Sequence, residues 1–228
     1  MPKTTFYNLS ATRRARIEEA AIDEFCKNGL RSAVLNNIVA NSGIAKGSFY
    51  QYFENLEDLY AHVLTLVQKR KTDLVASLET PNSIMDTFGY LRWLIQISVV
   101  FMLREPRLAK IEQRDFVDHP VINSIDPETG ERISGDGRFH ALLTQGVLHD
   151  DLATWVDTDM AAYVLNLIAN LIAPYMVDRI GDKASSLADG SVDIAYDPLV
   201  QALFDNLMDI IEAGIARDPQ IRKDFYSK

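Results

Sequence analysis

Apolar residues recur at helical spacing along almost the whole chain of 228 residues, and this periodicity constrains the fold more than any other feature. Ile17, Ala20, Ala21 and Phe25, for example, fall at positions i, i+3, i+4 and i+8, which lie on one face of an α-helix. No segment alternates polar and apolar residues as a half-buried strand does, and no internal repeat stands out. The pattern predicts an all-α protein.

Capping and turn-forming residues divide this pattern into segments. The expected helices span about residues 12–28, 35–41, 45–53, 55–80, 83–104, 106–118, 138–148, 160–180 and 197–217. Residues 119–137 and 181–196 are rich in turn formers, so we expect a loop or broken segment at the first and a mobile loop at the second. Ser10 or Thr12 can cap the first helix, and Asp197-Pro198 is typical of a helix start.

The charge is distributed unevenly. The net charge of −9 argues against a nucleic-acid partner, but residues 1–54 carry seven Lys and Arg against five acids. That gives +2 for this segment and leaves −11 for the rest of the chain. The asymmetry favours a small head that can approach phosphates and a larger body that cannot. We therefore expect the head to span residues 1–54 and the body residues 55–228.

The third expected helix carries side chains suited to DNA. A short helix, a turn with Gly43 and this third helix make a helix-turn-helix, whose second helix can enter a major groove. A lysine can reach a phosphate or guanine, a glycine admits close approach, and hydroxyl and amide groups can bond phosphates or base edges. The candidate DNA-binding residues are Lys46, Gly47, Ser48, Tyr50, Gln51 and Tyr52. Phe49 and Phe53 are expected to form the core of the head.

The stretch AAIDEFCKNGL…NNIVANSGIAKGSFYQYFENLEDLY resembles the N-terminal DNA-binding domain of the TetR family of transcriptional regulators. The resemblance covers about residues 12–60 and includes Ser42 to Gly47, Phe49 to Phe53 and Leu56 to Leu59. It implies a DNA-binding domain at residues 1–54 and an effector-binding and dimerisation domain at residues 55–228. The expected homodimer binds an inverted-repeat operator in double-stranded DNA and accommodates a small molecule in its helical body.

Three positions depart from the family pattern. Alanine stands at positions 33 and 45, where relatives often have threonine and serine as helix caps, so Ser32 or Ser42 is needed as a substitute. Leu56 replaces a lysine that contacts phosphate in relatives, which puts one charge contact in doubt.

The body offers candidates for an effector site. Aromatic residues at positions 60–180 suit an apolar pocket with few polar anchors, and Asn166 and Asn170 share one face of an apolar helix. The candidate effector-binding residues are Trp93, Phe101, Phe116, Asn166 and Asn170. The alternative is that the aromatic residues are ordinary core and that the two asparagines form a hydrogen-bonded pair.

The helices at about 158–180 and 197–217 are expected to form the homodimer, because both carry broad apolar surfaces.

No catalytic, cofactor or metal-binding motif is present, so we expect neither an enzyme nor a metal site. The lack of a long apolar run predicts no membrane span, and the single cysteine fits a cytoplasmic protein. The function predicted is a transcriptional repressor released from DNA by a small, largely apolar effector. Two alternatives remain: control by a protein partner, and a helical binding module without DNA affinity.

Overall fold

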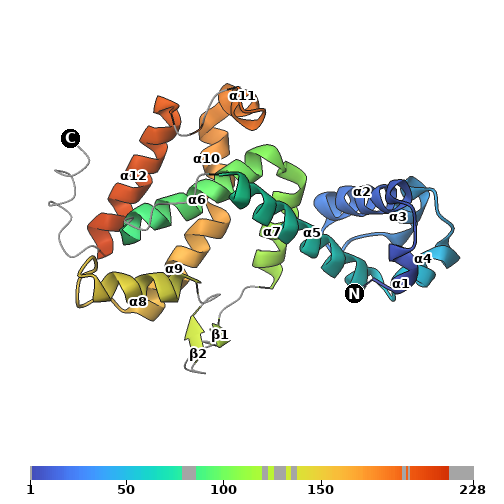
Figure 1. The fold of residues 1–228 in the computed structure, drawn as a ribbon, viewed down its shortest axis with the longest axis horizontal. Coiled ribbons are helices and arrows are strands. Elements are labelled where there is room, and N and C mark those ends of the chain that lie inside the picture. The colour runs from blue at the N-terminus through green and yellow to red at the C-terminus, as the bar shows by residue number, and fades with distance from the viewer. Residues whose placement is uncertain are drawn as a thin grey trace. The chain divides into compact units, whose positions relative to one another are not determined.

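The computed structural model describes residues 2–78, 86–119, 123–125, 132–134, 138–191, 194 and 196–215. The chain divides into two compact units (Figure 1). Unit 1 comprises Met1–Leu78 and Glu105–Asp118, and unit 2 comprises Glu79–Arg104 and His119–Lys228. The domain boundary expected between residues 54 and 55 separates the DNA-binding part of the chain from the rest, and it stays a prediction. By packing, the helices at 56–77 and 106–118 belong with the N-terminal helices.

The regular secondary structure described in unit 1 consists of helices, joined by turns. Its helices are α1 (Thr4–Tyr7), α2 (Ala11–Asn28), α3 (Leu35–Ser42), α4 (Lys46–Tyr52), α5 (Leu56–Ser77) and α7 (Pro106–Asp118). Ser10 caps α2 by accepting a hydrogen bond from the Arg13 backbone N–H, and Gly29 ends it with a φ of +66°. Asn55 accepts from the Asp58 N–H at 2.8 Å, while Asp58 accepts from the Glu54 N–H at 3.2 Å. These two bonds form a variant of the capping box, in which Asp58 bonds the N–H of the residue before the N-cap.

The start of α3 has no cap of its own, because its N-cap residue is Val34. Ser42 does not act as a substitute cap, since its hydroxyl donates to the Ile38 and Val39 carbonyl oxygens inside α3. The buried carboxylate of Glu24 on α2 instead accepts from the Val34 N–H at 2.8 Å. A side chain ten residues away therefore supplies the α3 cap. The N-cap of α4, Ala45, makes no side-chain cap.

The core of unit 1 is aromatic and aliphatic, and its larger side chains are fully buried. Its members come from α1, α2, α3, α4, α5 and the residue after α4: Phe6, Ile17, Ala21, Phe25, Ile38, Phe49, Phe53, Leu59, Val63 and Val67. The predicted role of Phe49 and Phe53 as core residues is confirmed, because both side chains have an exposed fraction of 0%.

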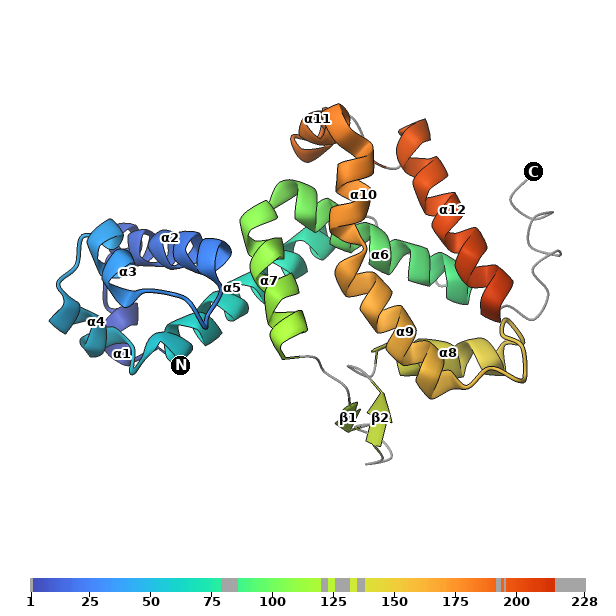
Figure 2. The same ribbon diagram turned by 180° about the vertical axis from the view of Figure 1, so that it is seen from behind.

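Unit 2 is also mostly helical. Its elements are α6 (Thr87–Arg104), β1 (Asn123–Ile125), β2 (Arg132–Ser134), α8 (Arg138–Leu148), α9 (Thr158–Leu171), α10 (Ala173–Ile180), the 3-10 turn η1 (Gly181–Lys183), α11 (Ala184–Ala188) and α12 (Pro198–Ile215). Both α10 and α12 contact α6, and α8 lies beside α9 (Figure 2). The fold class predicted from the sequence, all-α, is confirmed.

Two segment predictions for unit 2 were wrong, and a third was incomplete. The loop or broken segment expected at 119–137 contains β1 and β2, which pair antiparallel with Ser124 opposite Ile133. The loop expected at 181–196 contains η1 and α11. The single helix expected at 160–180 breaks at Ile172 into α9 and α10, because Pro174 has no N–H for the helical ladder and its ring crowds the preceding turn.

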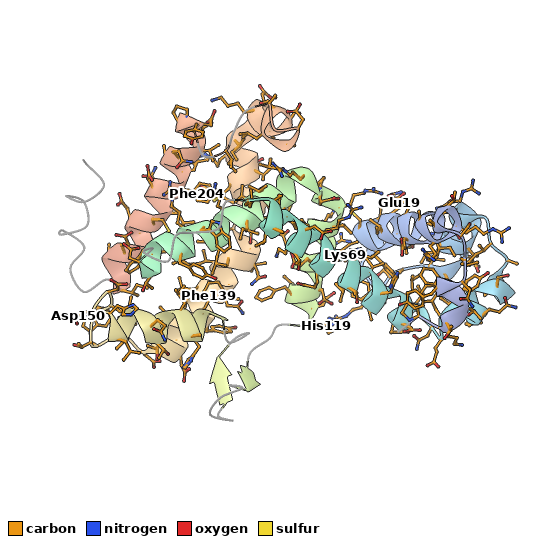
Figure 3. The ribbon with its side chains drawn as sticks, in the orientation of Figure 1. Glu19, Lys69, His119, Phe139, Asp150 and Phe204 are labelled. Atoms are coloured by element: carbon orange, nitrogen blue, oxygen red, sulfur yellow. The ribbon has the colours of Figure 1, made fainter. Side chains whose placement is uncertain are left out.

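The core of unit 2 gathers side chains from α6, α8, α9, α10, α11 and α12. Phe139 of α8 and Phe204 of α12 are two of its large members, with exposed fractions of 3% and 1% (Figure 3). Arg92 of α6 bonds Asp205 and Gln201 of α12, each at 2.7 Å, and its guanidinium lies over the Phe204 ring. The guanidinium of Arg92 thus links α6 to α12.

Among the described residues, no single helix has the length and apolar character needed to cross a membrane. Among the described helices, only Thr158–Leu171 and Ala173–Ala188 taken together have the length and apolar composition of a membrane span. They are bent by 43° where they meet.

Candidate nucleic-acid interface

The turn between α3 and α4 has the geometry of a helix-turn-helix. Gly43 adopts a left-handed conformation with a φ of +69° and a ψ of 30°, which an L side chain rarely adopts. The Ile44 N–H donates to the Val39 carbonyl at 3.1 Å and closes the end of α3. After Ile44 and Ala45 the chain re-enters a helix at Lys46. The glycine therefore sets the direction in which α4 leaves α3.

One face of α4 is exposed and polar. Lys46, Gly47, Tyr50 and Gln51 lie at i, i+1, i+4 and i+5, so they share this face, and all four are exposed. A Cβ added at Gly47 would meet nothing within 4 Å, so the backbone there is open to a close approach. The structure thus brings four of the six predicted DNA-binding residues together on one surface.

The other two predicted residues, Ser48 and Tyr52, are half-buried on the flank of α4. The Tyr52 ring lies 6.4 Å from the Phe6 ring, measured between centroids. On the inner side, Phe49 and Phe53 stack with a centroid distance of 5.5 Å. This buried pair fixes the rotation of α4 about its own axis and so determines which residues face outward.

The cations of unit 1 differ in what they are free to bind. Lys46 forms no ion pair with any residue in the described part of the chain, and the same holds for the exposed Arg13 and Arg16. Arg14 donates to the carbonyl oxygens of Tyr7 at 2.7 Å and Leu9 at 2.9 Å, so it closes the end of α1. Lys3 donates from its ammonium to the Tyr50 carbonyl at 3.0 Å. The sequence alone did not show that Arg14 and Lys3 bind backbone carbonyls while Lys46 is left for another partner.

The start of α5 has the backbone geometry of an anion site but not the charge. The first N–H groups of a helix have no partner within it, and Asn55 to Glu57 form this start. Glu57 and Asp58 add negative charge to the first turn. These two carboxylates oppose the binding of a phosphate here.

Two acidic side chains of α2 are paired with an arginine of α7. Arg107 bonds Asp23 at 2.6 Å and Glu19 at 2.8 Å (Figure 3 labels Glu19 on α2). These hydrogen bonds raise the pKa of Arg107 further above its usual value. Arg114 of α7 donates to the Phe25 and Cys26 carbonyls at the end of α2, at 3.3 and 2.9 Å. Two arginines of α7 therefore bind α2 along its length, and the sequence pattern contained no signal for this pairing.

The predicted effector residues are not all in one unit. Phe116 is half-buried on α7 in unit 1, whereas Trp93, Phe101, Asn166 and Asn170 lie in unit 2. Phe101 is buried, and Trp93 is half-buried with its ring 5.5 Å from that of Tyr90. A groove of about 370 Å³ on unit 1 is lined by Arg16, Glu19 and Asp23 among others, so its charges do not suit an apolar ligand.

The two asparagines of α9 bond to each other. The Asn170 amide donates to the Asn166 side-chain oxygen at 2.9 Å and to its backbone oxygen at 2.8 Å. The hydrogen-bonded pair considered for them is therefore present. Asn166 is only 2% exposed, and its own NH2 group has no hydrogen-bond partner in the described chain.

A search of the described residues finds no cluster of three or more histidine, cysteine, aspartate or glutamate side chains that could hold a metal. His140 of α8 lies 3.5 Å from Asp159 of α9, which is a pair and not a metal site.

Comparison with known proteins places this geometry in a family. Residues 17–63 match the model of bacterial regulatory proteins of the tetR family. A TetR family transcriptional regulator from Chloroflexus aurantiacus is 32% identical, with a TM-score of 0.76 over 96% of this chain and 100% of that one.

Two curated relatives match over most of their length. The fatty acid metabolism regulator protein of Bacillus subtilis is 24% identical over 187 residues, which are 74% of this chain and 95% of the relative. The probable acrEF/envCD operon repressor of Escherichia coli is 23% identical over 199 residues, 79% and 90% of the two chains. These relatives are regulators rather than enzymes, as the sequence predicted. The chain, with its helix-turn-helix and exposed polar α4 face, belongs to the TetR family of DNA-binding transcriptional regulators.

Proposed function

We propose that the protein is a homodimeric repressor that inserts α4 into the major groove at each half of an inverted-repeat operator. A small, largely apolar effector bound in unit 2 releases it from DNA. The observation that carries the proposal is the exposed α4 face of Lys46, Gly47, Tyr50 and Gln51 over the buried Phe49–Phe53 pair. A relative named as an operator repressor supports the direction of regulation.

The α4 side chains have different roles in this proposal. The Gln51 amide can both donate to and accept from a base edge, so we assign it base reading. The Tyr50 hydroxyl is assigned to a phosphate, and Lys46 to a phosphate or a guanine. Ser48 and Tyr52 are half-buried and take part only from the flank of the helix.

Selection of bound fragments from random DNA tests the proposal. We expect an inverted repeat whose half-sites are spaced by the helical turn of DNA. Gln51→Ala should cost roughly 1–3 kcal/mol and relax the preference at one position of each half-site. Tyr50→Phe should weaken all sequences alike, and Lys46→Ala should lower the salt slope by about one unit if it contacts a phosphate. Wild-type binding by all three variants would show that α4 does not read DNA.

The dimer is proposed from apolar stripes on two helices of unit 2. Met160, Val164 and Leu171 of α9 share one face and are exposed by 62%, 44% and 41%. On α12, Leu199 and Ile210 are exposed by 39% and 72%, with Leu203 and Leu207 between them on the same face. Because Leu203 and Leu207 also pack against the unit 2 core, Ile210 is the better position at which to test association.

The effector site is proposed around Asn166. A buried amide N–H without a partner costs free energy, and an acceptor oxygen on a ligand would relieve that cost. The surroundings on α9 are apolar, with Ala162, Leu165 and Ala169 all buried. We infer an effector with an apolar body and at least one acceptor oxygen. Trp93 and Phe101 are proposed to line the site, and Phe116, which lies in unit 1, has the weakest support.

Saturated fatty acids are suitable first probes, since one relative is named a fatty acid metabolism regulator. We expect at least one of them to release the selected operator. Asn166→Leu should leave the free protein as stable as wild type, while raising the concentration needed for release. Asn170→Leu is the matched control, because it removes the bond to Asn166 without removing the buried donor. Release only by highly charged, sugar-like compounds would contradict an apolar effector.

A further inference from the structure

The segment before α2 completes the hydrogen bonding of the α4 helix. The last four carbonyl groups of a helix have no partner within it. In α4 these belong to Phe49, Tyr50, Gln51 and Tyr52, and all four are satisfied. The Phe49 oxygen accepts from the Phe53 N–H at 2.9 Å. Among the described residues, the other three accept only from Lys3 and Thr5.

Lys3 and Thr5 together make three hydrogen bonds to the carbonyl groups at the end of α4. The Lys3 backbone N–H donates to the Tyr52 oxygen at 2.8 Å, and its ammonium donates to the Tyr50 oxygen at 3.0 Å. The Thr5 hydroxyl donates to the Gln51 oxygen. The ammonium also lies at the negative end of the α4 dipole, where a cation is favourable. Figures 1 and 2 both show α1 beside α4.

This cap matters because α4 has only seven residues and no other cap. Ala45 provides no side-chain bond at its start, and Phe53 leaves the helix in an extended conformation without a glycine. A helix this short is not stable by itself in water. Its last turn carries Tyr50 and Gln51, two of the proposed DNA contacts.

The capping segment is itself held in place. Phe6 is fully buried, with ring centroids 4.9 Å from Phe53 and 5.2 Å from His62. Pro2 is buried as well, and Arg14 binds the carbonyls at the end of α1. Lys3 and Thr5 therefore act from a fixed platform and not from a free arm.

We propose that Lys3 and Thr5 are positioning residues for DNA recognition: they hold the last turn of α4 in the helical form that presents Tyr50 and Gln51 to the operator. The proposal rests on the proposed role of α4 in reading DNA. If the last turn is helical in only a fraction of molecules, the apparent operator affinity falls by that fraction.

Two pairs of variants test this. Thr5→Val removes the hydroxyl and keeps the shape, whereas Thr5→Ser keeps the hydroxyl. Lys3→Pro removes both Lys3 bonds at a φ of −72°, which proline accepts, whereas Lys3→Ala removes only the ammonium bond. Operator affinity is measured at several salt concentrations, well below the unfolding temperature. Amide exchange is followed at Tyr50 to Phe53, with Val63 and Val67 of α5 as internal controls.

We expect Thr5→Val to weaken operator binding about threefold and the Lys3→Pro/Thr5→Val double variant about tenfold or more. Thr5→Ser should restore binding to within about twofold of wild type. Exchange at Tyr50 to Phe53 should accelerate in parallel with the affinity loss, while Val63 and Val67 keep wild-type rates. A purely structural role would slow or speed exchange throughout unit 1 and leave the affinity of the folded protein unchanged.

Three results would overturn the proposal. The double variant could match wild type in both affinity and exchange. Affinity could fall with unchanged exchange at Tyr50 to Phe53, or Lys3→Ala could lower the salt slope by about one unit, either of which means direct contact with DNA. If wild-type protein selects no DNA at all, the proposed function fails instead, and the exchange rates then decide whether Lys3 and Thr5 cap α4.

Discussion

In unit 1, α4 exposes Lys46, Tyr50 and Gln51 above a fully buried aromatic core, whereas in unit 2, α9 and α12 expose Met160 and Ile210 and bury Asn166. The polar side chains of α4 are thus exposed in unit 1, whereas α9 of unit 2 buries a polar side chain. A polar exposed surface suits a phosphate-bearing partner. Exposed apolar stripes and a buried unpaired amide suit apolar partners, which here are proposed to be a second copy and an effector. The two units are therefore expected to respond differently to equivalent substitutions.

The largest effects should come from the two cores. Phe53→Ala and Phe204→Ala each remove a ring that is at most 1% exposed, so each should cost about 3–5 kcal/mol of unfolding free energy. We expect Phe53→Ala to accelerate amide exchange in unit 1 and Phe204→Ala in unit 2. Equal acceleration in both units by either variant would show that the two cores unfold as one.

Ile210→Glu tests the apolar surface of unit 2. The side chain is 72% exposed in the protomer, so the change should leave the fold of the protomer intact. A charge buried between two copies should weaken association about a hundredfold or more, as measured by sedimentation. Tyr196→Glu is the control, because Tyr196 is 83% exposed and lies outside the stripe. Unchanged association of Ile210→Glu would exclude α12 from the interface.

Glu24→Gln tests the polar interior of unit 1. Burial alone would raise the pKa of Glu24, but hydrogen bonds from the Val34 N–H, Asn28 and Asn37 outweigh it and lower the pKa from 4.5. A carboxyl with a lowered folded pKa stabilises above its unfolded pKa, and this contribution is lost as the pH falls through the folded pKa.

We therefore expect Glu24→Gln to lower the unfolding free energy by about 1–3 kcal/mol at pH 7. The difference from wild type should shrink as the pH falls below about 4, as measured by denaturant titration. The exposed Glu54→Gln serves as the control and should show little difference at either pH. A pH-independent loss in Glu24→Gln would mean that packing, and not the carboxylate, stabilises α3.

The smallest effect should come from Gly47→Ala. Because nothing lies within 4 Å of the added methyl group, the free protein should gain roughly 0.5–1 kcal/mol of stability from the better helix former. Operator affinity should nevertheless fall, since the methyl group would meet DNA at a close approach. Gly214→Ala in α12 has equal space and should leave DNA binding unchanged. Unaltered affinity in Gly47→Ala would place this turn of α4 away from the DNA backbone.

Local signals predicted the elements well. The bounds of α7 and the start of α12 follow from proline and capping residues at positions 106, 197 and 198, and the structure confirms both. The break at Ile172 could also have been found, because Pro174 lies inside the apolar pattern of 160–180. The short strands at 123–125 and 132–134 could not, since three-residue strands have no periodicity to detect.

The sequence predicted which residues form the candidate site, but not which side chains are buried around it or hold it in place. The spacing of Lys46, Tyr50 and Gln51 places them on one helix face, and this much is local geometry. Apolar spacing cannot say which leucines of α12 are core, and Leu203 and Leu207 turned out to pack against the unit 2 core. The same ambiguity holds for Asn166, whose burial depends on helices far away in the sequence.

The sequence by itself determined the helical fold, the helix-turn-helix and the residues that face outward from α4, because these depend on contacts within a few residues along the chain. Only the tertiary structure decided how the backbone groups at the start of α3 and the end of α4 are satisfied. Glu24 reaches Val34, and Lys3 and Thr5 reach the end of α4 from more than forty residues away. A buried donor or acceptor must find a partner, but which side chain supplies it depends on how the packed core brings distant segments together.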